Sequence, residues 1–109
     1  MKINQEYEGT TIDAADEAVT VNVGDADVIA FDVTGTFTAT LTAEASVDGT
    51  TFVTVTGLNI GSNSAASTLT AAGVLRINVA QGFEKIRLRV SAYTSGAAVV
   101  KYQTARTSK

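Results

Sequence analysis

The residues from 36 to 47 alternate strictly between apolar and polar side chains, and this pattern excludes most folds open to a short chain. One side carries Phe37, Ala39, Leu41, Ala43, Ala45 and Val47, and the other carries Thr36, Thr38, Thr40, Thr42, Glu44 and Ser46. Successive side chains of a strand point to opposite faces, so a period of two predicts one long, half-buried strand. Asp48-Gly49 then supplies the positive-φ residues of a tight hairpin turn. Phe52 and Val55 continue the pattern into a return strand at residues 51–56, which makes the chain an all-β protein.

Length and composition indicate one domain with a substantial core. The chain has 109 residues, of which 45% are hydrophobic, and this size fits a single domain. No run approaches the roughly 18 consecutive apolar residues that cross a membrane, and the first residues lack the apolar segment of a signal peptide. Cysteine is absent, which excludes disulfides and fits synthesis in a reducing cytoplasm. We therefore expect neither membrane association nor conventional export.

Histidine, the commonest general base and metal ligand, is also absent. Neither a Ser-His-Asp nor a Cys-His arrangement can form, and no phosphate-binding glycine loop is present. Asp25 and Asp27 stand close together, but their spacing matches no calcium-binding loop, so a turn with solvated acids is the favoured interpretation. We expect a protein that is not an enzyme and that has no catalytic residue, cofactor or metal.

The net charge of −3 conceals a strong asymmetry along the chain. Residues 1–50 carry ten acids and one base, whereas residues 51–109 carry seven bases and one acid. The fold can bring the two halves together so that charges pair across strands, or opposite patches can meet between subunits or on a partner. A nucleic-acid site on the basic half is the least favoured alternative, because the whole chain is acidic and would repel phosphates. We expect no nucleic-acid partner.

Shorter alternating segments predict about eight strands in total. Besides the hairpin, they lie at residues 19–23, 28–33, 67–70, 74–79, 85–93 and 98–104. Thr94-Ser95-Gly96 is expected to close a hairpin. The Gly-, Ser- and Ala-rich segment 57–73 is either a crossover between sheets or a flexible contact loop. Many short strands at regular spacing are typical of a single-domain antiparallel β-sandwich or jelly-roll-like fold.

The N-terminal segment and the basic residues of the late strands are two candidate contact surfaces for a partner. Residues 1–16 are polar and weakly patterned, with Ile3, Tyr7 and Ile12 as their large apolar side chains, and we expect an extended arm before a sandwich domain at 17–109. Four basic residues are predicted to point outward from late strands, namely Arg76, Arg87, Arg89 and Lys101. If their strands are neighbours they form one basic face, either solvated or in contact with another subunit.

Three segments between Phe37 and Tyr102 resemble a type of small β-sandwich found among the structural proteins of tailed bacteriophages. They are LTAEASVDGTTF at 41–52, AGVLRI at 72–77 and KIRLRVSAYTSG at 85–96. In the similar proteins a strand enters an SVDGT turn followed by an aromatic residue, often Trp where this chain has Phe52. The match leaves the arm and the segment 57–73 without a counterpart.

This resemblance implies a component of the phage particle. The expected role is a capsid decoration, or cement, protein on the capsid exterior, made in the bacterial cytoplasm. The expected partners are the major capsid protein and the chain itself, as a homotrimer. Contacts would come from the arm and the four basic residues. The alternative is a tail or fibre module that binds carbohydrate, for which Tyr93 is the candidate aromatic contact because it sits near a predicted hairpin.

Overall fold

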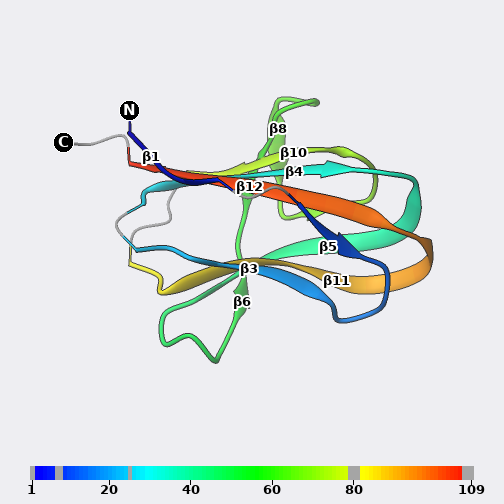
Figure 1. Cartoon of the computed structure of the whole chain (residues 1–109), viewed down its shortest axis with the longest axis horizontal. Helices are drawn as coiled ribbons and strands as arrows, with labels where there is room; N and C mark the ends of the chain where they lie inside the picture. Colours follow the sequence, from blue (N-terminus) through cyan, green and yellow to red (C-terminus); the bar gives the residue numbers. More distant parts are fainter. Residues whose placement is uncertain (1, 7–8, 25, 79–81, 107–109) are drawn as a thin grey trace.

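The computed structural model describes residues 2–6, 9–24, 26–78 and 82–106, the first of these ranges by its backbone. Two antiparallel sheets lie face to face as a β-sandwich, as the alternation predicts, and the described residues contain no helix (Figure 1). The strands are β1 (Lys2–Glu6), β2 (Thr10–Ile12), β3 (Ala18–Asn22), β4 (Val28–Thr34), β5 (Phe37–Ser46), β6 (Val53–Thr54), β7 (Gly57–Asn59), β8 (Ser64–Ala66), β9 (Thr68–Leu69), β10 (Gly73–Ile77), β11 (Lys85–Gly96) and β12 (Ala98–Arg106). The count exceeds eight because the N-terminal segment expected to be an arm forms β1 and β2, and because the segment 57–73 contributes β7 and β8 besides the predicted strand at 67–70.

The two sheets differ in size. The larger sheet has the order β1-β12-β4-β10-β7-β8, and β2 also pairs with β12. The smaller sheet has the order β3-β11-β5-β6, and β9 also pairs with β5. The long strand predicted at residues 36–47 is β5, in the smaller sheet. The segment 57–73 carries β7 and β8 in the larger sheet and β9 in the smaller one, so it crosses between the sheets.

The turn after β11 does not close a hairpin, contrary to the sequence-based expectation. The chain leaves β11 in the smaller sheet at Gly96 and enters β12 in the larger one at Ala98. This connection lies beside the one from β4 to β5, which crosses between the sheets in the opposite direction (Figure 1). Two glycines allow these passages to touch. A Cβ on Gly35, whose φ is +108°, would lie 2.6 Å from the Ala97 carbonyl oxygen, and one on Gly96 would lie 2.4 Å from that of Thr36. Only glycine fits such an approach at positive φ.

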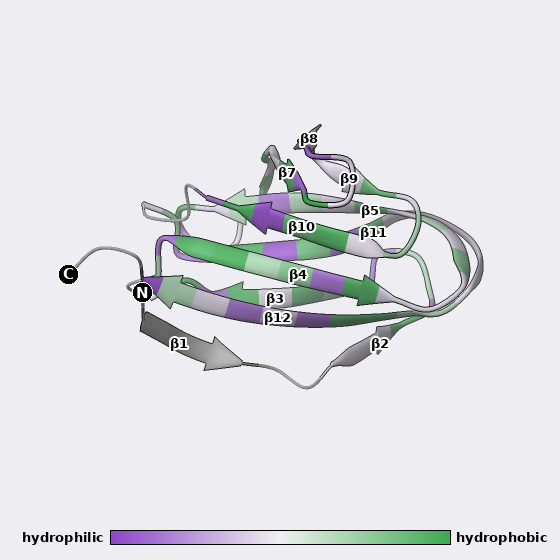
Figure 2. Cartoon of the chain, turned by 90° about the horizontal axis from the view of Figure 1, so that it is seen from above, coloured by the Kyte–Doolittle hydropathy of each residue, from purple (hydrophilic) through white to green (hydrophobic). Residues whose placement is uncertain are grey.

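The core forms where the inward side chains of the two sheets meet. In β3, β4 and β12 every second side chain is buried, as predicted, and Figure 2 shows the resulting change of hydropathy along β4 and β12. The largest fully buried side chains include Phe31, Ile29, Leu41, Leu75 and Leu88. Phe31 also meets the ring of Tyr102 at a centroid distance of 6.5 Å. The prediction of alternating inward residues is therefore confirmed for most of the chain.

The alternation fails in three places. The strand predicted to be half-buried, β5, is buried on both faces from Leu41 to Ser46, because Thr42, Glu44 and Ser46 on its polar side are also buried. Val47 was expected on the apolar side, but it follows the end of β5 and is 72% exposed. Ala92 was expected inward with Val90, but the register of β11 against β5 shifts between these two residues, and Ala92 is exposed. A bulge of this kind adds one residue to a strand and reverses the faces beyond it. Val79, another predicted inward residue, lies outside the described residues.

The predicted tight turn at Asp48-Gly49 is a longer loop. Ala45 pairs with Val53, so the loop between these partners spans residues 46–52 and includes Ser46, the last residue of β5. The predicted return strand is only Val53–Thr54. Asp48 closes the loop because its Oδ1 accepts hydrogen bonds from the Thr50 and Thr51 amides, each at 2.9 Å, and from Ser46 Oγ. These bonds hold the pKa of Asp48 far below its ordinary value, chiefly through the two backbone amides.

The N-terminal segment lies along the larger sheet of its own domain. Both β1 and β2 pair antiparallel with β12, with a register shift in β1 between Ile3 and Gln5. Ile12, at the end of β2, is only 3% exposed and belongs to the core. Residues 2–6 are therefore an edge strand, whereas Ile12 is bound into the sandwich.

Candidate functional site

The four basic residues expected on one face lie on two different sheets. Arg87 and Arg89 are on β11 in the smaller sheet, whereas Arg76 on β10 and Lys101 on β12 belong to the larger one. All four alternate with buried residues, so each pair points outward from its own sheet. Because the sheets pack through their inner faces, the pairs face opposite sides of the sandwich, and the single basic face expected from the sequence does not form.

Arg87 and Arg89 instead surround one buried acid of β5. The Glu44 carboxylate accepts Arg87 Nε at 2.7 Å on Oε1 and Arg89 Nη2 at 3.1 Å on Oε2. Arg89 also donates its Nη1 to Asp16 Oδ1 at 2.8 Å. Glu44 and Asp16 come from the acidic half of the chain and both arginines from the basic half. At these residues the charge asymmetry is therefore resolved by pairing within the fold.

The environment of Glu44 sets its protonation. Burial raises the pKa of this carboxyl, but the hydrogen bonds and positive charges of Arg89 and Arg87 outweigh burial and leave the pKa below its ordinary value. The same contacts raise the pKa of Arg89, first through the hydrogen bond to Glu44. The group is thus a permanent charge network and not a proton-transfer pair, which would need pKa values near the working pH.

Neighbouring residues cover this network. The Arg87 guanidinium lies over the Phe52 ring, 3.8 Å from its centroid, within the range of a cation–π interaction. On the other side of Arg89, Thr42 Oγ1 and Ser91 Oγ are hydrogen-bonded at 2.7 Å. The aromatic residue after the SVDGT segment therefore has a structural contact in this chain, as the cover of an ion pair.

The remaining predicted contact residues have separate positions. Lys101 is exposed and stands opposite Asp32 across β12 and β4, and Arg76 is half-buried opposite Ala30. The side chains of Ile3 and Tyr7 lie outside what the structure describes. The Tyr93 hydroxyl donates to the Gly96 carbonyl at 2.9 Å, and its ring packs on the edge of the core. The Tyr93 hydroxyl is therefore already bonded within the chain and is not free to bind a sugar.

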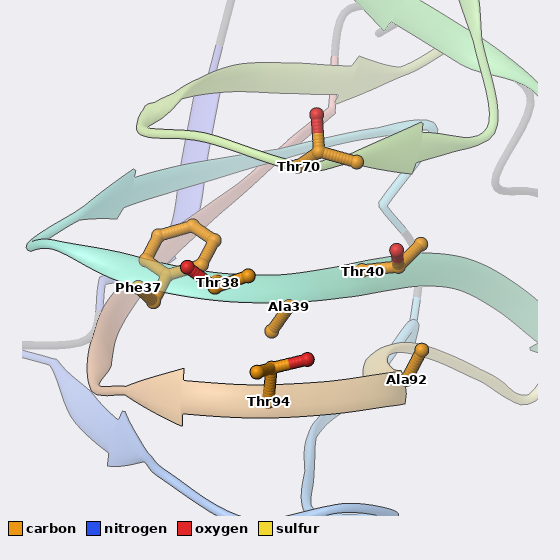
Figure 3. Close-up of a pocket in the computed structure, with 7 residues that line it drawn as sticks. All are labelled: Phe37, Thr38, Ala39, Thr40, Thr70, Ala92 and Thr94. Carbon is orange, nitrogen blue, oxygen red and sulfur yellow. The ribbon is translucent and has the colours of Figure 1, made fainter.

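Two shallow hollows lie along the smaller sheet. One, of about 300 Å³, crosses β5 between β11 and Thr70 (Figure 3). Its lining consists of Phe37, Thr38, Ala39, Thr40, Thr70, Ala92 and Thr94. The other, of about 290 Å³, lies between β5 and the 46–52 loop beside Val47 and Val53, which are both exposed. Among the described residues no group of three or more acids, histidines or cysteines could hold a metal ion. The described part of the chain has no helix long and apolar enough to span a membrane.

Two solved structures share this fold. The SPBc2 prophage-derived protein YomS superposes with a TM-score of 0.68 at 16% identity, over 96% of this chain and 99% of its own. The PBSX exported protein XepA superposes with a TM-score of 0.72 at 19% identity, over 89% of this chain but only 38% of its own. No family model matches the chain, and no curated protein sequence matches it significantly. At these identities the likeness concerns the fold, a β-sandwich also found in proteins that prophages encode.

Sequence reasoning missed the centre of the charge network and the threonine-lined hollow. Glu44 was placed on a solvated face of its strand, although it was the lone charged residue among the threonines of that face. A charge in the middle of a long strand, opposite two arginines two residues apart, is the signal that could have identified it. The hollow depends on the bulge in β11 and on Thr70 from a distant segment, and no local pattern encodes either contact.

Proposed function

We propose that this chain is a non-enzymatic structural protein of a tailed-phage particle, of the capsid decoration kind. The observation that supports this most directly is the end-to-end likeness to YomS, a prophage-derived protein of matching extent. The likeness to part of XepA, from a second prophage, points the same way. The resemblance of three segments to small phage β-sandwiches supports it independently, because it rests on sequence and not on the fold.

The surface of the molecule suits a protein held by many modest contacts. The arginines of the smaller sheet are occupied by Glu44 and Asp16. The larger sheet presents Lys101 and Arg76, and β1 lies at its edge, where β12 is the one described strand paired with it. An edge strand offers unpaired backbone groups to a neighbouring chain. We assign the contacts with the major capsid protein, and those of a homotrimer, to this sheet and its β1 edge.

The structure limits how this assignment is tested. Removing residues 1–16 would delete Ile12 from the core, so the truncation must end before β2. We expect the variant lacking residues 1–8 to keep its thermal transition and to lose binding to particles from phage that lack this protein, measured by co-sedimentation. Lys101→Gln should weaken the same binding, and Lys85→Gln, which removes the same charge from β11 of the smaller sheet, should not. Unchanged binding of the truncated and Lys101 variants would refute the assigned surface.

A further inference from the structure

The hollow across β5 combines polar groups with an aromatic edge and has no charge. Four of its seven lining residues are threonines, and the others are Phe37, Ala39 and Ala92. Thr38, Thr70 and Thr94 are exposed and Phe37 is half-buried. Figure 3 shows Thr70 on one side of β5 and Thr94 on the other, with Phe37 and Thr38 on β5 between them. Its volume of about 300 Å³ lies at the lower end of the roughly 300–1,000 Å³ of small-molecule sites.

The backbone of β5 adds polar groups on the side toward Thr70. The Ala43 amide donates to the Ser67 carbonyl at 2.9 Å, and the Ala43 carbonyl accepts from the Val55 amide at 3.0 Å, so Ala43 faces away from β11. Backbone groups two residues apart in an antiparallel strand point the same way, which directs those of Ala39 to this edge too. Among the described strands, β9 pairs only with Leu41 and Thr42 and β6 only with Glu44 and Ala45. Ala39 therefore lies on a stretch of edge that none of them covers.

The chemistry of this lining selects one class of ligand. A charged ligand would require an ionic partner, and none of the described lining residues carries a charge. The charge network around Glu44, on the same sheet, is satisfied internally. Threonine hydroxyls both donate and accept hydrogen bonds. The Phe37 ring packs against the core but is only half-buried, and the part of it that lines the hollow provides an apolar surface. Hydroxyl-rich, uncharged molecules with one apolar face fit this combination.

We infer that the hollow formed by Phe37, Thr38, Thr40, Thr70, Ala92 and Thr94 binds a neutral saccharide unit. The uncovered edge is too short for the alternative of an added peptide strand, because it spans only residues 37–40. The site differs from the one expected at Tyr93, whose hydroxyl is already bonded to the Gly96 carbonyl. The inference does not depend on a role in the phage particle, since saccharide binding is measurable on the isolated domain.

The test is a titration of the isotope-labelled full chain with glucose, galactose, mannose and N-acetylglucosamine, followed by amide chemical shifts. We expect at least one of these sugars to shift the amides of residues 37–40 and 92–94 saturably, and glucuronate not to bind more tightly than glucose. The double variant Thr38→Val and Thr94→Val should weaken that binding at least tenfold, because valine keeps the shape of threonine and removes its hydroxyl. Thr20→Val, exposed on β3 of the same sheet, is the matched control and should bind normally.

Each other outcome would overturn the inference. Absence of saturable shifts in the hollow with all four neutral sugars would do so, as would equal binding by the wild type and the double variant. Shifts of residues 37–40 produced by a short extended peptide, and not by sugars, would identify the edge as a strand-addition site instead. The thermal transition of each valine variant is measured in parallel, and an unchanged transition assigns any loss of binding to the missing hydroxyls.

Discussion

Glu44 is the residue whose replacement should most clearly reveal how this sandwich uses its charges. Its carboxylate accepts hydrogen bonds from Arg87 Nε, Arg89 Nε and Arg89 Nη2, at distances from 2.7 to 3.2 Å, and the residue is 7% exposed. Glu44→Gln keeps the shape of the side chain but leaves two guanidinium groups without their anion. Breaking a fully buried ion pair costs about 3–5 kcal/mol.

The cost here is lower, because the arginine side chains retain exposures of 26% and 27% and water can replace part of the lost interaction. We therefore expect Glu44→Gln to lower the free energy of unfolding by about 2–3 kcal/mol. For a domain of about 100 residues this corresponds to a fall in Tm of about 8–24 °C. The free energy of unfolding is measured by urea unfolding followed by circular dichroism. Asp13→Asn is the exposed control, and its free energy of unfolding should lie within about 0.5 kcal/mol of the wild-type value.

A double-mutant cycle with Arg89→Met separates the ion pair from packing. If Glu44→Gln costs no more than the Asp13 control, or if the cycle shows no coupling, the network does not stabilise the fold and the reasoning is refuted.

Three further predictions concern acid, the aromatic cover and the glycines. The folded-state pKa values of Glu44 and Asp48 are lowered, so the stabilisation from their charged forms is present at neutral pH and is lost as pH falls below the ordinary values of 4.5 and 3.8. In unfolding curves recorded between neutral and acid pH, Glu44→Gln should therefore reduce the loss of unfolding free energy with falling pH. If stability falls as steeply with pH in the variant as in wild type, Glu44 does not contribute to this acid dependence. Phe52→Leu should cost about 0.5–1 kcal/mol in wild type through the lost contact with Arg87 and less in an Arg87→Met background, whereas equal costs in both would exclude the cation–π contribution. Gly35→Ala and Gly82→Ala both place a Cβ at positive φ, but only the Cβ at position 35 collides with backbone. In thermal unfolding we expect a loss of stability of about 1 kcal/mol for Gly82→Ala and of at least about 3 kcal/mol for Gly35→Ala. Equal losses would mean that the backbone at Ala97 moves aside at little cost.

The fold could be predicted from the sequence wherever one face of a strand is buried. Val19 and Val21, or Ile29 and Phe31, had to point inward, because the reverse register would bury Thr20 or Asp32. The connections could not be predicted in this way. A turn signal such as Thr94-Ser95-Gly96 shows that the chain bends, but not whether it returns to the same sheet or passes to the other.

The candidate site was less accessible to sequence reasoning, because it depends on which strands are neighbours. Arg76 and Arg89 have the same outward pattern, yet their strands lie in different sheets, and only sheet order separates them. The pairing of Arg87 with Glu44 spans 43 positions in the chain. The sequence shows Glu44 and Arg87 as opposite charges, but it does not show that they meet. Only the register of β5 against β11 places them side by side.

The central claim, a structural role in a phage particle, is tested most directly by counting the protein in purified particles. Quantitative mass spectrometry of density-gradient virions gives its copy number relative to the major capsid protein. A decoration protein predicts hundreds of copies in a fixed ratio to the capsid subunit. A handful of copies would contradict the decoration role and indicate a tail or fibre position, and absence from particles would contradict the structural role altogether.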